Sequence, residues 1–392
     1  MAGFDDIPQQ LSERRDNNLY RSRRNIGSPQ GRTLLVDGKE LLNFCSNDYL
    51  GLAGDPRVSE ALIAGTQQWG VGSGASHLVC GHTDAHHRLE QELAEFTKRP
   101  RALLFSSGYA ANLGVINGLL SSGDYVIEDK LNHASLLDGA LLSRAHFSRY
   151  RHKDYQHLTE LLEKTGDSDN RKLIVTDGVF SMDGDSCDTA ILADSARKAD
   201  AWLMIDDAHG FGVTGQQGHG TVDPGLYDTD DVQILMCTLG KACGTMGAFV
   251  AGTDELIETL IQEARTFIYT TALPAAVAVA SSKSLEIIRE ESWRRERLTD
   301  LISQFRDGAE AAGLELLPSS TPIQPVLLGS ESLALKVAEL LELQDVMISA
   351  IRPPTVPKNT SRLRITLTAN HNEDDINKLL RALTRAMQEA GA

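Results

Sequence analysis

The chain of 392 residues is 41% hydrophobic and 23% charged, a composition that is ordinary for a soluble globular protein. This length predicts either two or three domains or one large α/β domain with an appendage. The formal net charge of −16 argues against sequence-independent binding to nucleic acid, whose phosphates would be repelled, so we expect no nucleic-acid partner.

Residues 1–50 are expected to form an N-terminal segment with two features. A basic cluster runs from Arg14 to Arg24, and it is either an exposed arm or helix or a local anion site. The stretch "RTLLVDGKELLNFCSNDYLG" follows, with apolar runs on both sides of Asp37 and Gly38. This pattern predicts a hairpin with Asp37-Gly38 at its turn.

Residues 51–285 are expected to form a large domain, because short apolar strands alternate there with helical stretches such as 189–199. Most strand candidates are continuous apolar runs, as expected for strands that helices cover on both faces. The pattern predicts an α/β fold with a largely parallel sheet. The strand candidates are 101–108, 125–130, 172–178, 201–210, 232–240 and 247–252.

Residues 286–392 are expected to form a smaller α+β C-terminal domain. One long charged helix is predicted over 284–313, followed by strands at 324–329 and 362–368 with a helix between them. The last helix has an apolar stripe at helical spacing, and Asn372 is its predicted N-cap.

The sequence carries no targeting or membrane signal that we recognise. Its N-terminus lacks a positive region followed by an apolar core, and no uncharged apolar run approaches the about 18 residues of a membrane span. The five cysteines are scattered, without a C-x-x-C pair, as expected for reduced thiols. We therefore expect a cytoplasmic protein that has no membrane partner and no structural metal.

Polar clusters follow several of the predicted strands, at 106–108, 177–181, 206–209 and 238–241. In an open parallel sheet, ligands bind at the carboxyl ends of the strands. We therefore expect these four clusters to converge at one edge of the sheet and to form a binding site there.

Lys241 lies in "TLGKACGTMGA", between small and apolar neighbours. A phosphate-binding P-loop is excluded, because residue 242 is Ala where Ser or Thr is needed. Two interpretations remain open. The side chain either reaches from a loop to water, or it is a desolvated amine with a lowered pKa that forms a Schiff base with an aldehyde.

Asp206 ends an apolar strand in "MIDDAHG", so its carboxylate is expected to be buried and to need a cationic partner. A pyridinium nitrogen, which pyridoxal phosphate (PLP) enzymes commonly pair with Asp, would be such a partner. Alternatively, Asp206, Asp207 and His209 could ligate a metal ion.

Two further stretches fit an aromatic phosphorylated cofactor. His133 in "LNHASLLDG" could stack on a cofactor ring, or it could cap the helix that follows it. Gly108 and Tyr109 in "SSGYAAN" lie at a strand-to-helix turn, where their backbone N–H groups could hold a phosphate.

Taken together, these stretches resemble those of the α-oxoamine synthases, PLP-dependent enzymes of fold type I in the aspartate aminotransferase superfamily. The resemblance runs nearly end to end and implies a mostly parallel sheet of the seven-stranded type in the large domain. The motifs that carry it are "NFCSNDYLGL", "FSSGYAAN", "LNHASLLDG", "TDGVFSMDGD", "MIDDAHGFGV", "TLGKACG" and "AIRPPTVPKNTSRLRITLTANH".

The resemblance implies that PLP is the cofactor and gives each catalytic residue a role. Lys241 would hold PLP, Asp206 would pair with its pyridine nitrogen, His209 would bond its phenolic oxygen, and His133 would stack on the ring. The further cofactor contacts would be Ser181, Thr238, Gly108, Tyr109 and, from the second subunit, Thr270. The active site would then exist only in a homodimer.

The resemblance also implies substrates. Arg364 would clamp the carboxylate of the amino acid, and Asn47, Arg21, Thr355 and His133 would contact substrate. The last of the motifs favours the branch that condenses L-alanine with pimeloyl-CoA or pimeloyl-acyl carrier protein. The product would be 8-amino-7-oxononanoate, made for biotin, with loss of CO2. The alternatives are another α-oxoamine synthase, such as a glycine-using 2-amino-3-oxobutyrate CoA ligase, and a non-catalytic PLP-binding protein.

Overall fold

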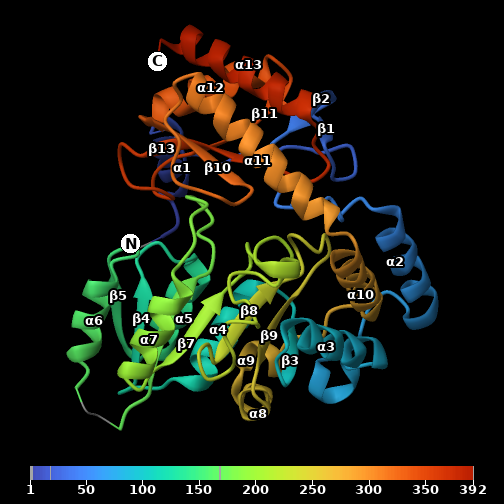
Figure 1. Cartoon of the computed structure of the whole chain (residues 1–392), viewed down its shortest axis with the longest axis vertical. Coiled ribbons are helices and arrows are strands. Elements are labelled where there is room, and N and C mark those ends of the chain that lie inside the picture. The colour runs from blue at the N-terminus through green and yellow to red at the C-terminus, as the bar shows by residue number, and fades with distance from the viewer. Residues whose placement is uncertain (1–2, 18, 167–168, 392) are drawn as a thin grey trace.

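The computed structural model describes residues 3–17, 19–166 and 169–391. Figure 1 shows a large lower part built on one wide sheet and a smaller upper part that contains the C-terminal elements. The N-terminal hairpin lies with the smaller part, beside elements from the other end of the chain. The division into domains at residues 50 and 285 stays a prediction.

The large part is organised around a seven-stranded sheet in the order β3-β9-β8-β7-β6-β4-β5. Strands β4 to β8 pair in parallel, whereas β9 runs antiparallel to both of its neighbours, β3 and β8. The predicted α/β fold with a mostly parallel sheet is confirmed. The strands are β3 (Arg101–Phe105), β4 (Tyr125–Asp129), β5 (His146–Tyr150), β6 (Lys172–Asp177), β7 (Trp202–Asp206), β8 (Ile234–Thr238) and β9 (Ala248–Gly252).

Apolar residues cover both faces of this sheet, which explains why its strands are continuous apolar runs. Along β3, Ala102 and Leu104 belong to one apolar cluster, whereas Leu103 and Phe105 belong to another on the opposite face. The helices of this part are α2 (Pro56–Trp69), α3 (Asp84–Thr97), α4 (Gly108–Leu119), α5 (Ala134–Ser143), α6 (Tyr155–Glu163), α7 (Thr189–Lys198), α8 (Asp254–Glu263), α9 (Arg265–Ile268) and α10 (Ala275–Glu290), with a short π-helix η1 (His77–Gly81) and a 3₁₀ turn η2 (Gln216–Gly218).

The smaller part contains two three-stranded sheets. Strands β1 (Thr33–Val36) and β2 (Lys39–Asn43) form the predicted hairpin around Asp37-Gly38, and β11 (Val346–Met347) pairs in parallel with β2. The second sheet has the antiparallel order β10-β13-β12, and it confirms the two predicted C-terminal strands. Its strands are β10 (Ile323–Gly329), β12 (Ser349–Ile351) and β13 (Ser361–Thr366), and the nearby helices are α11 (Trp293–Ala311), α12 (Glu331–Glu342) and α13 (Glu373–Ala390), the last capped by Asn372 as predicted.

The single helix predicted over 284–313 is wrong, because the chain forms two helices there, α10 and α11. Tertiary hydrogen bonds accompany the break. The buried guanidinium of Arg294 donates to the backbone oxygen of Leu50 at 2.7 Å and to Asp55 at 3.1 Å, while it also pairs with Glu291. These contacts fix the direction of α11 from outside the helix, so the local sequence does not reveal them.

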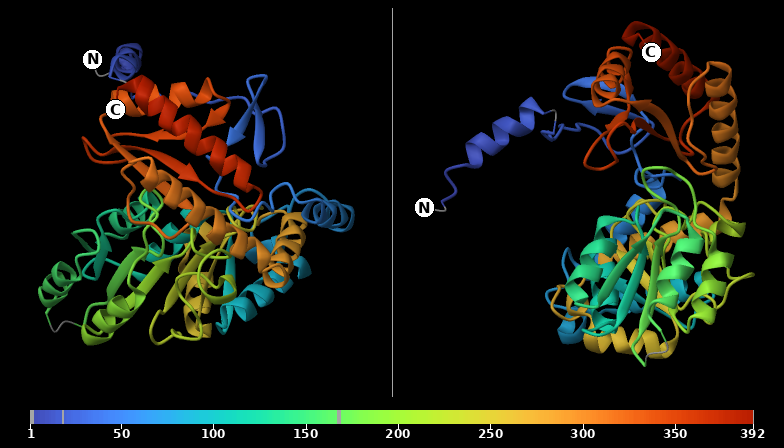
Figure 2. Two further views of the ribbon diagram at one scale, coloured as in Figure 1. Left: turned by 45° about the horizontal axis from the view of Figure 1, so that its top comes forward. Right: turned by 90° about the vertical axis from the view of Figure 1, so that its left-hand side faces the viewer.

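The N-terminal helix α1 (Ile7–Asp16) projects away from the rest of the molecule in the right-hand view of Figure 2. None of its residues is buried. Within the basic cluster, Arg24 pairs with Asp37 and Glu342, so this part of the cluster is tied to the body of the protein. Among the described residues, no helix is both long and apolar enough to cross a bilayer.

Candidate active site

A cavity of about 180 Å³ opens at the carboxyl ends of β6, β7 and β8. It brings together all four polar clusters that the sequence places after strands. Eight of the predicted site residues line it: Gly108, Tyr109, His133, Ser181, Asp206, His209, Thr238 and Lys241. It is also lined by residues to which the sequence analysis gave no individual role: Asp177, Val179 and Ala208, which lie in the predicted clusters, and Asn112, Ser135 and Met236, which lie outside them.

Lys241 lies in the turn between β8 and β9. The turn packs tightly against the preceding chain at Gly244, which has a φ of 66° and lies so close to Ala53 that a Cβ would meet its backbone nitrogen at 2.3 Å. Burial lowers the pKa of Lys241 to about 8, although the carboxylates of Asp206 and Asp177 act in the opposite direction. The side chain is therefore a desolvated amine inside the cavity and does not extend from a loop to water.

This lowered pKa predicts how apoprotein reacts with PLP. Below the pKa of about 8 the Lys241 side chain is mostly ammonium and cannot attack an aldehyde, whereas above it the free amine predominates. We therefore expect the rate of covalent PLP attachment to rise with pH and to level off above about 8. Stopped-flow absorbance of apoprotein mixed with PLP at a series of pH values measures this rate. A rate that still rises toward the ordinary lysine pKa would contradict the desolvated site.

Asp206 ends β7, lines the cavity and is only 5% exposed. One oxygen accepts a hydrogen bond from the Asn112 side chain at 2.7 Å, and the other accepts from the backbone N–H of Ala208 at 3.0 Å. Among the described residues, no lysine or arginine forms an ion pair with it. A buried carboxylate that is held in place but lacks a cation fits the protonated pyridine nitrogen of PLP.

His133 joins Asp206 through a chain of hydrogen bonds. The amide nitrogen of Asn112 also donates to the hydroxyl of Ser135 at 2.8 Å, and that hydroxyl lies 2.7 Å from Nδ1 of His133. The backbone N–H of Ser135 donates to the same Nδ1 at 3.3 Å, so His133 caps α5 and also lines the cavity. The two interpretations of His133 are therefore compatible. With Nδ1 accepting, Nε2 of the neutral ring carries the proton.

A hydrogen bond with Tyr49 positions the ring of His209. The buried Tyr49 hydroxyl lies 2.6 Å from Nδ1 of His209. Burial, with a smaller contribution from the charge of Lys241, lowers the pKa of His209 well below its usual value, and burial raises the pKa of Tyr49 to about 12. Tyr49 therefore keeps its proton and donates a hydrogen bond to Nδ1, and Nε2–H of the neutral His209 ring is left as a hydrogen-bond donor.

The N-terminus of α4 forms another wall of the cavity. Ser107 caps this helix by accepting a hydrogen bond from the N–H of Ala110 at 3.2 Å. In the described part of the chain, the N–H groups of Gly108 and Tyr109 have no partner. Together with the helix dipole, these two groups fit a phosphate. Across the cavity, the Thr238 hydroxyl is anchored to the backbone oxygen of Gly247 at 3.0 Å.

Arg364, from β13, lies beside the cavity without lining it. Its Nε donates to the backbone oxygen of Ser181 at 2.6 Å, and the same guanidinium donates to Asn47 at 3.2 Å and to Thr366 at 3.1 Å. These bonds join the smaller part of the protein to the edge of the cavity. They also bring Arg364 and Asn47, which were both predicted to contact substrate, into direct contact with each other.

The structure does not bring the other three predicted residues to this cavity. Arg21 is exposed, and the backbone oxygen of the preceding Tyr20 accepts a hydrogen bond from Arg352, in the turn that also contains Thr355. Thr270 follows α9 and does not line the cavity of its own chain. The predicted roles of Arg21, Thr355 and Thr270 stay predictions.

The alternative metal site at Asp206, Asp207 and His209 has no support in the geometry. Asp207 accepts two hydrogen bonds from Thr221, both at 2.8 Å, and it does not line the cavity. The groups in the described part of the chain that could hold a metal ion do not include any of the three residues.

Asn112 and Ser135 line the cavity without having been predicted, and Asp177, which begins the predicted cluster 177–181, was given no role of its own. Asp177 ends β6 beside Asp206 and accepts a hydrogen bond from the backbone N–H of His133. Burial raises the pKa of Asp177 well above its usual value. The sequence does offer a signal for Asn112, a polar side chain one turn after Gly108 on the same helix. Ser135 shows no such signal beyond its place next to His133.

Comparisons with known proteins agree with this geometry. Residues 39–383 match the family described as aminotransferase class I and II. The chain is 58% identical to an 8-amino-7-oxononanoate synthase from Saccharophagus degradans, an alignment that covers 98% of this chain and 97% of the relative. A solved structure of SPT with a PLP internal aldimine superposes with a TM-score of 0.93 at 27% identity, covering 99% and 98% of the two chains. The crystal structure of 8-amino-7-oxononanoate synthase from Francisella tularensis gives a TM-score of 0.77 at 32% identity, covering 90% and 99%.

Proposed function

Because this chain belongs to the aminotransferase class I and II family and, within it, to the 8-amino-7-oxononanoate synthases, we propose that it condenses L-alanine with a pimeloyl thioester. The products are 8-amino-7-oxononanoate, CO2 and a free thiol, and the reaction serves biotin biosynthesis. The enzyme is a PLP-dependent acyltransferase. The observation that carries the proposal is the desolvated amine of Lys241 in one cavity with Asp206, His133 and His209.

The geometry suggests how the chain's own residues perform the reaction. When bound, PLP stabilises the electron pair that is left on Cα of the amino acid after its proton is removed. Asp206 would keep a proton on the pyridine nitrogen, and Nε2–H of His209 would donate a hydrogen bond to the phenolic oxygen. The neutral amine of Lys241 takes the α proton, as a base with a pKa near the working pH does efficiently.

The carbon–carbon bond then forms between Cα and the thioester carbonyl carbon, and the C–S bond breaks as the thiol leaves. Nε2–H of His133 is free to donate to the oxygen of the forming ketone. The alanine carboxyl group is lost as CO2, and Cα is reprotonated by Lys241. Arg364 orients the carboxylate, once that carboxylate replaces Asn47 as an acceptor for its guanidinium.

A substrate matrix tests this proposal. L-alanine, glycine and L-serine are each offered to the purified enzyme with pimeloyl-CoA, pimeloyl-acyl carrier protein and acetyl-CoA, and thiol release is measured. We expect turnover with alanine and one or both pimeloyl thioesters. Turnover with glycine and acetyl-CoA alone would indicate a 2-amino-3-oxobutyrate CoA ligase instead, and PLP binding without turnover in any pairing would indicate a non-catalytic protein.

We further propose that the enzyme is a cytoplasmic homodimer whose active sites are shared. Large apolar side chains are exposed on the segments 71–79 and 269–270 and favour a covered surface: Val71 is 82% exposed, Val79 is 77% exposed and Tyr269, next to Thr270, is 71% exposed. The bridge between Ser76 and Thr271 brings the chain around Val79 next to the segment that contains Thr270. In this proposal Thr270 reaches the phosphate in the partner's cavity.

Hybrid dimers test the shared site. Lys241→Ala abolishes one chain's own amine, and Thr270→Asp puts a negative charge where the partner's phosphate would lie. Each variant alone is expected to be inactive. Because a mixed dimer regains one intact site, refolding or coexpressing the two should restore about a quarter of the wild-type turnover per chain. If both residues serve the same chain, the mixture stays inactive.

A further inference from the structure

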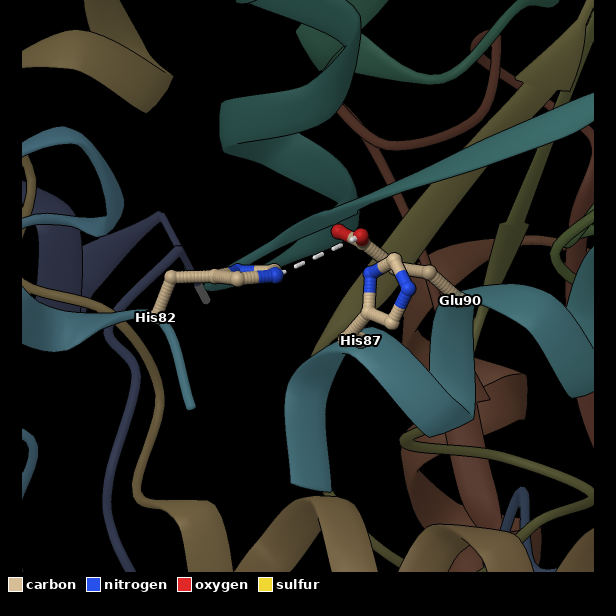
Figure 3. Close-up of side chains that lie close together, drawn as sticks. All are labelled: His82, His87 and Glu90. Atoms are coloured by element: carbon tan, nitrogen blue, oxygen red, sulfur yellow. Dashed lines mark ion pairs between the residues drawn. The ribbon is translucent and has the colours of Figure 1, made fainter. Parts of the chain in front are cut away.

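A second group of titratable side chains lies outside the cavity, on η1 and the start of α3. It contains four histidines whose rings are in contact: His77, His82, His86 and His87. None of them lines the active-site cavity, and the proposed reaction uses none of them. Figure 3 shows the outer part of this group, in which His82, His87 and Glu90 converge on one point.

Their ligand atoms lie close enough to share one ion. One nitrogen of His82, one of His87 and one carboxylate oxygen of Glu90 all lie within 4.8 Å of one another, and Nε2 of His82 is 3.9 Å from Oε2 of Glu90. A tetrahedral zinc ion with bonds of about 2.0–2.1 Å needs its ligand atoms about 3.3 Å apart. Because both histidines are exposed, small side-chain rotations close this gap.

His77 orients His82 for such a role. Nδ1 of His77 lies 2.9 Å from Nδ1 of His82, and the His77 ring stacks on Phe267 with centroids 5.0 Å apart. If Nδ1 of His82 donates to Nδ1 of His77, the lone pair of His82 lies on Nε2, which faces Glu90. A hydrogen bond on the far nitrogen is the usual arrangement of a metal-binding histidine.

Glu90 supplies the negative charge. Its Oε1 accepts a hydrogen bond from the backbone N–H of Leu104 at 3.0 Å, whereas its Oε2 lies 3.9 Å from Nε2 of His82. Its side chain is only 13% exposed, and no lysine or arginine of the described chain forms an ion pair with it. A partly buried carboxylate without a cation is stabilised by a bound cation.

A second group in the described chain, His152 with Asp183 and Asp185, makes a useful contrast. Both ring nitrogens of His152 already contact carboxylates, at 3.0 Å and 3.1 Å, and Lys153 pairs with Asp185 at 2.9 Å. The carboxylates of this group are thus already paired with protein cations. Burial lowers the pKa of His152, but the hydrogen bonds and charges of Asp129 and Asp185 outweigh burial and raise this pKa to about 9. In the group of His82, His87 and Glu90, Nε2 of His82 and Oε2 of Glu90 lie 3.9 Å apart, beyond hydrogen-bond distance, and Nε2 of His87 contacts only the side-chain amide nitrogen of Gln91 at 3.1 Å, which an ion would displace.

We propose that Nε2 of His82, a ring nitrogen of His87 and Oε2 of Glu90 bind one divalent transition-metal ion of the zinc type, with water as the fourth ligand. Two neutral imidazoles and one carboxylate are the ligands that such ions prefer. The ion ties the turn that follows η1 to the first two turns of α3. This clamp lies beside the chain around Leu273, whose backbone oxygen lies 2.7 Å from Nε2 of His86.

Calorimetric titration of untagged, chelator-treated holoenzyme with ZnCl2, and separately with CoCl2, tests the proposal. We expect one ion per chain. His82→Gln, His87→Gln and Glu90→Gln should each weaken binding by at least about tenfold, since even the loss of an outer partner of a ligand costs that much. Zinc should also raise the melting temperature of the wild type but not that of His87→Gln. His87→Gln is the most informative variant, because an exposed helix residue is replaced without loss of packing.

His146→Gln is the matched control, because His146 is exposed and lies on β5, away from this group. It should bind zinc like the wild type. The proposal is overturned if the wild type binds neither ion, if His82→Gln and His87→Gln both bind zinc as tightly as the wild type, or if His146→Gln weakens binding equally. Turnover of the three ligand variants is not needed for this decision.

Discussion

Replacing Lys241 with Ala is expected to remove the covalent attachment of PLP and to lower kcat by at least about 10²–10⁴-fold, the range that a positioned acid–base group contributes. Lys241 has two roles in the proposed reaction, because its amine both holds the cofactor and moves the α proton. Its lowered pKa and its place among Asp206, His209 and His133 are the structural basis for this expectation.

Two measurements check this result. Borohydride reduction followed by mass spectrometry of tryptic peptides should find the PLP adduct on Lys241 in the wild type and no adduct in Lys241→Ala. Lys241→Arg keeps a cation but offers no nucleophilic amine, so it should be as inactive as the alanine variant. A PLP adduct on another lysine of the wild type, or substantial turnover by either variant, would show that the reacting centre is elsewhere.

Asp206→Asn should separate cofactor binding from catalysis. The variant side chain can still accept a hydrogen bond from Asn112 or Ala208, but it cannot keep the pyridine nitrogen protonated. We expect PLP to remain attached to Lys241 while kcat falls on the order of 10²–10³-fold, as it does when a preorganised electrostatic contact is removed. Spectrophotometric PLP titration and steady-state kinetics measure the two effects.

Asp207→Asn is the control for Asp206→Asn. Asp207 is the neighbouring carboxylate and is equally buried, but it faces Thr221 and not the cavity. The control should lower the melting temperature and retain most of its kcat. Similar losses of kcat in both variants would mean that the effect comes from a disturbed β7 end and not from the pyridine nitrogen.

The fold of the large part was predictable because most of its strands are marked by a pattern of neighbouring residues in the sequence. Continuous apolar runs predict strands that are covered on both faces, and such runs identify β6, β7 and β8 directly. Strand β5 was missed, because it lies at the edge of the sheet and its sequence, "HFSRY", is largely polar. An edge strand has only one neighbour and needs no continuous apolar run.

The break between α10 and α11 could not be predicted for a different reason. No proline or glycine marks it, and Ser292 forms no side-chain cap. The direction of α11 depends on contacts that Arg294 makes with Leu50 and Asp55, more than 200 residues earlier in the chain. Such contacts exist only once the fold has formed.

In the candidate site, too, some features have a local signal in the sequence and others depend on contacts between distant segments. The convergence of strand ends predicts that Lys241, Asp206 and His209 share a cavity, because parallel strands bring their carboxyl ends to one edge. The hydrogen bonds of Asn112 and Ser135 join residues from three different elements and have no local signature.

The fate of the alanine carboxyl carbon tests the central claim most directly. L-alanine labelled with ¹³C in its carboxyl group is incubated with the holoenzyme and pimeloyl-CoA or pimeloyl-acyl carrier protein, and the gas and the products are analysed by mass spectrometry. The account predicts one ¹³CO2 for each thiol released and an unlabelled product with the mass of 8-amino-7-oxononanoate. Thiol release without ¹³CO2, or a product that retains the label, would contradict it.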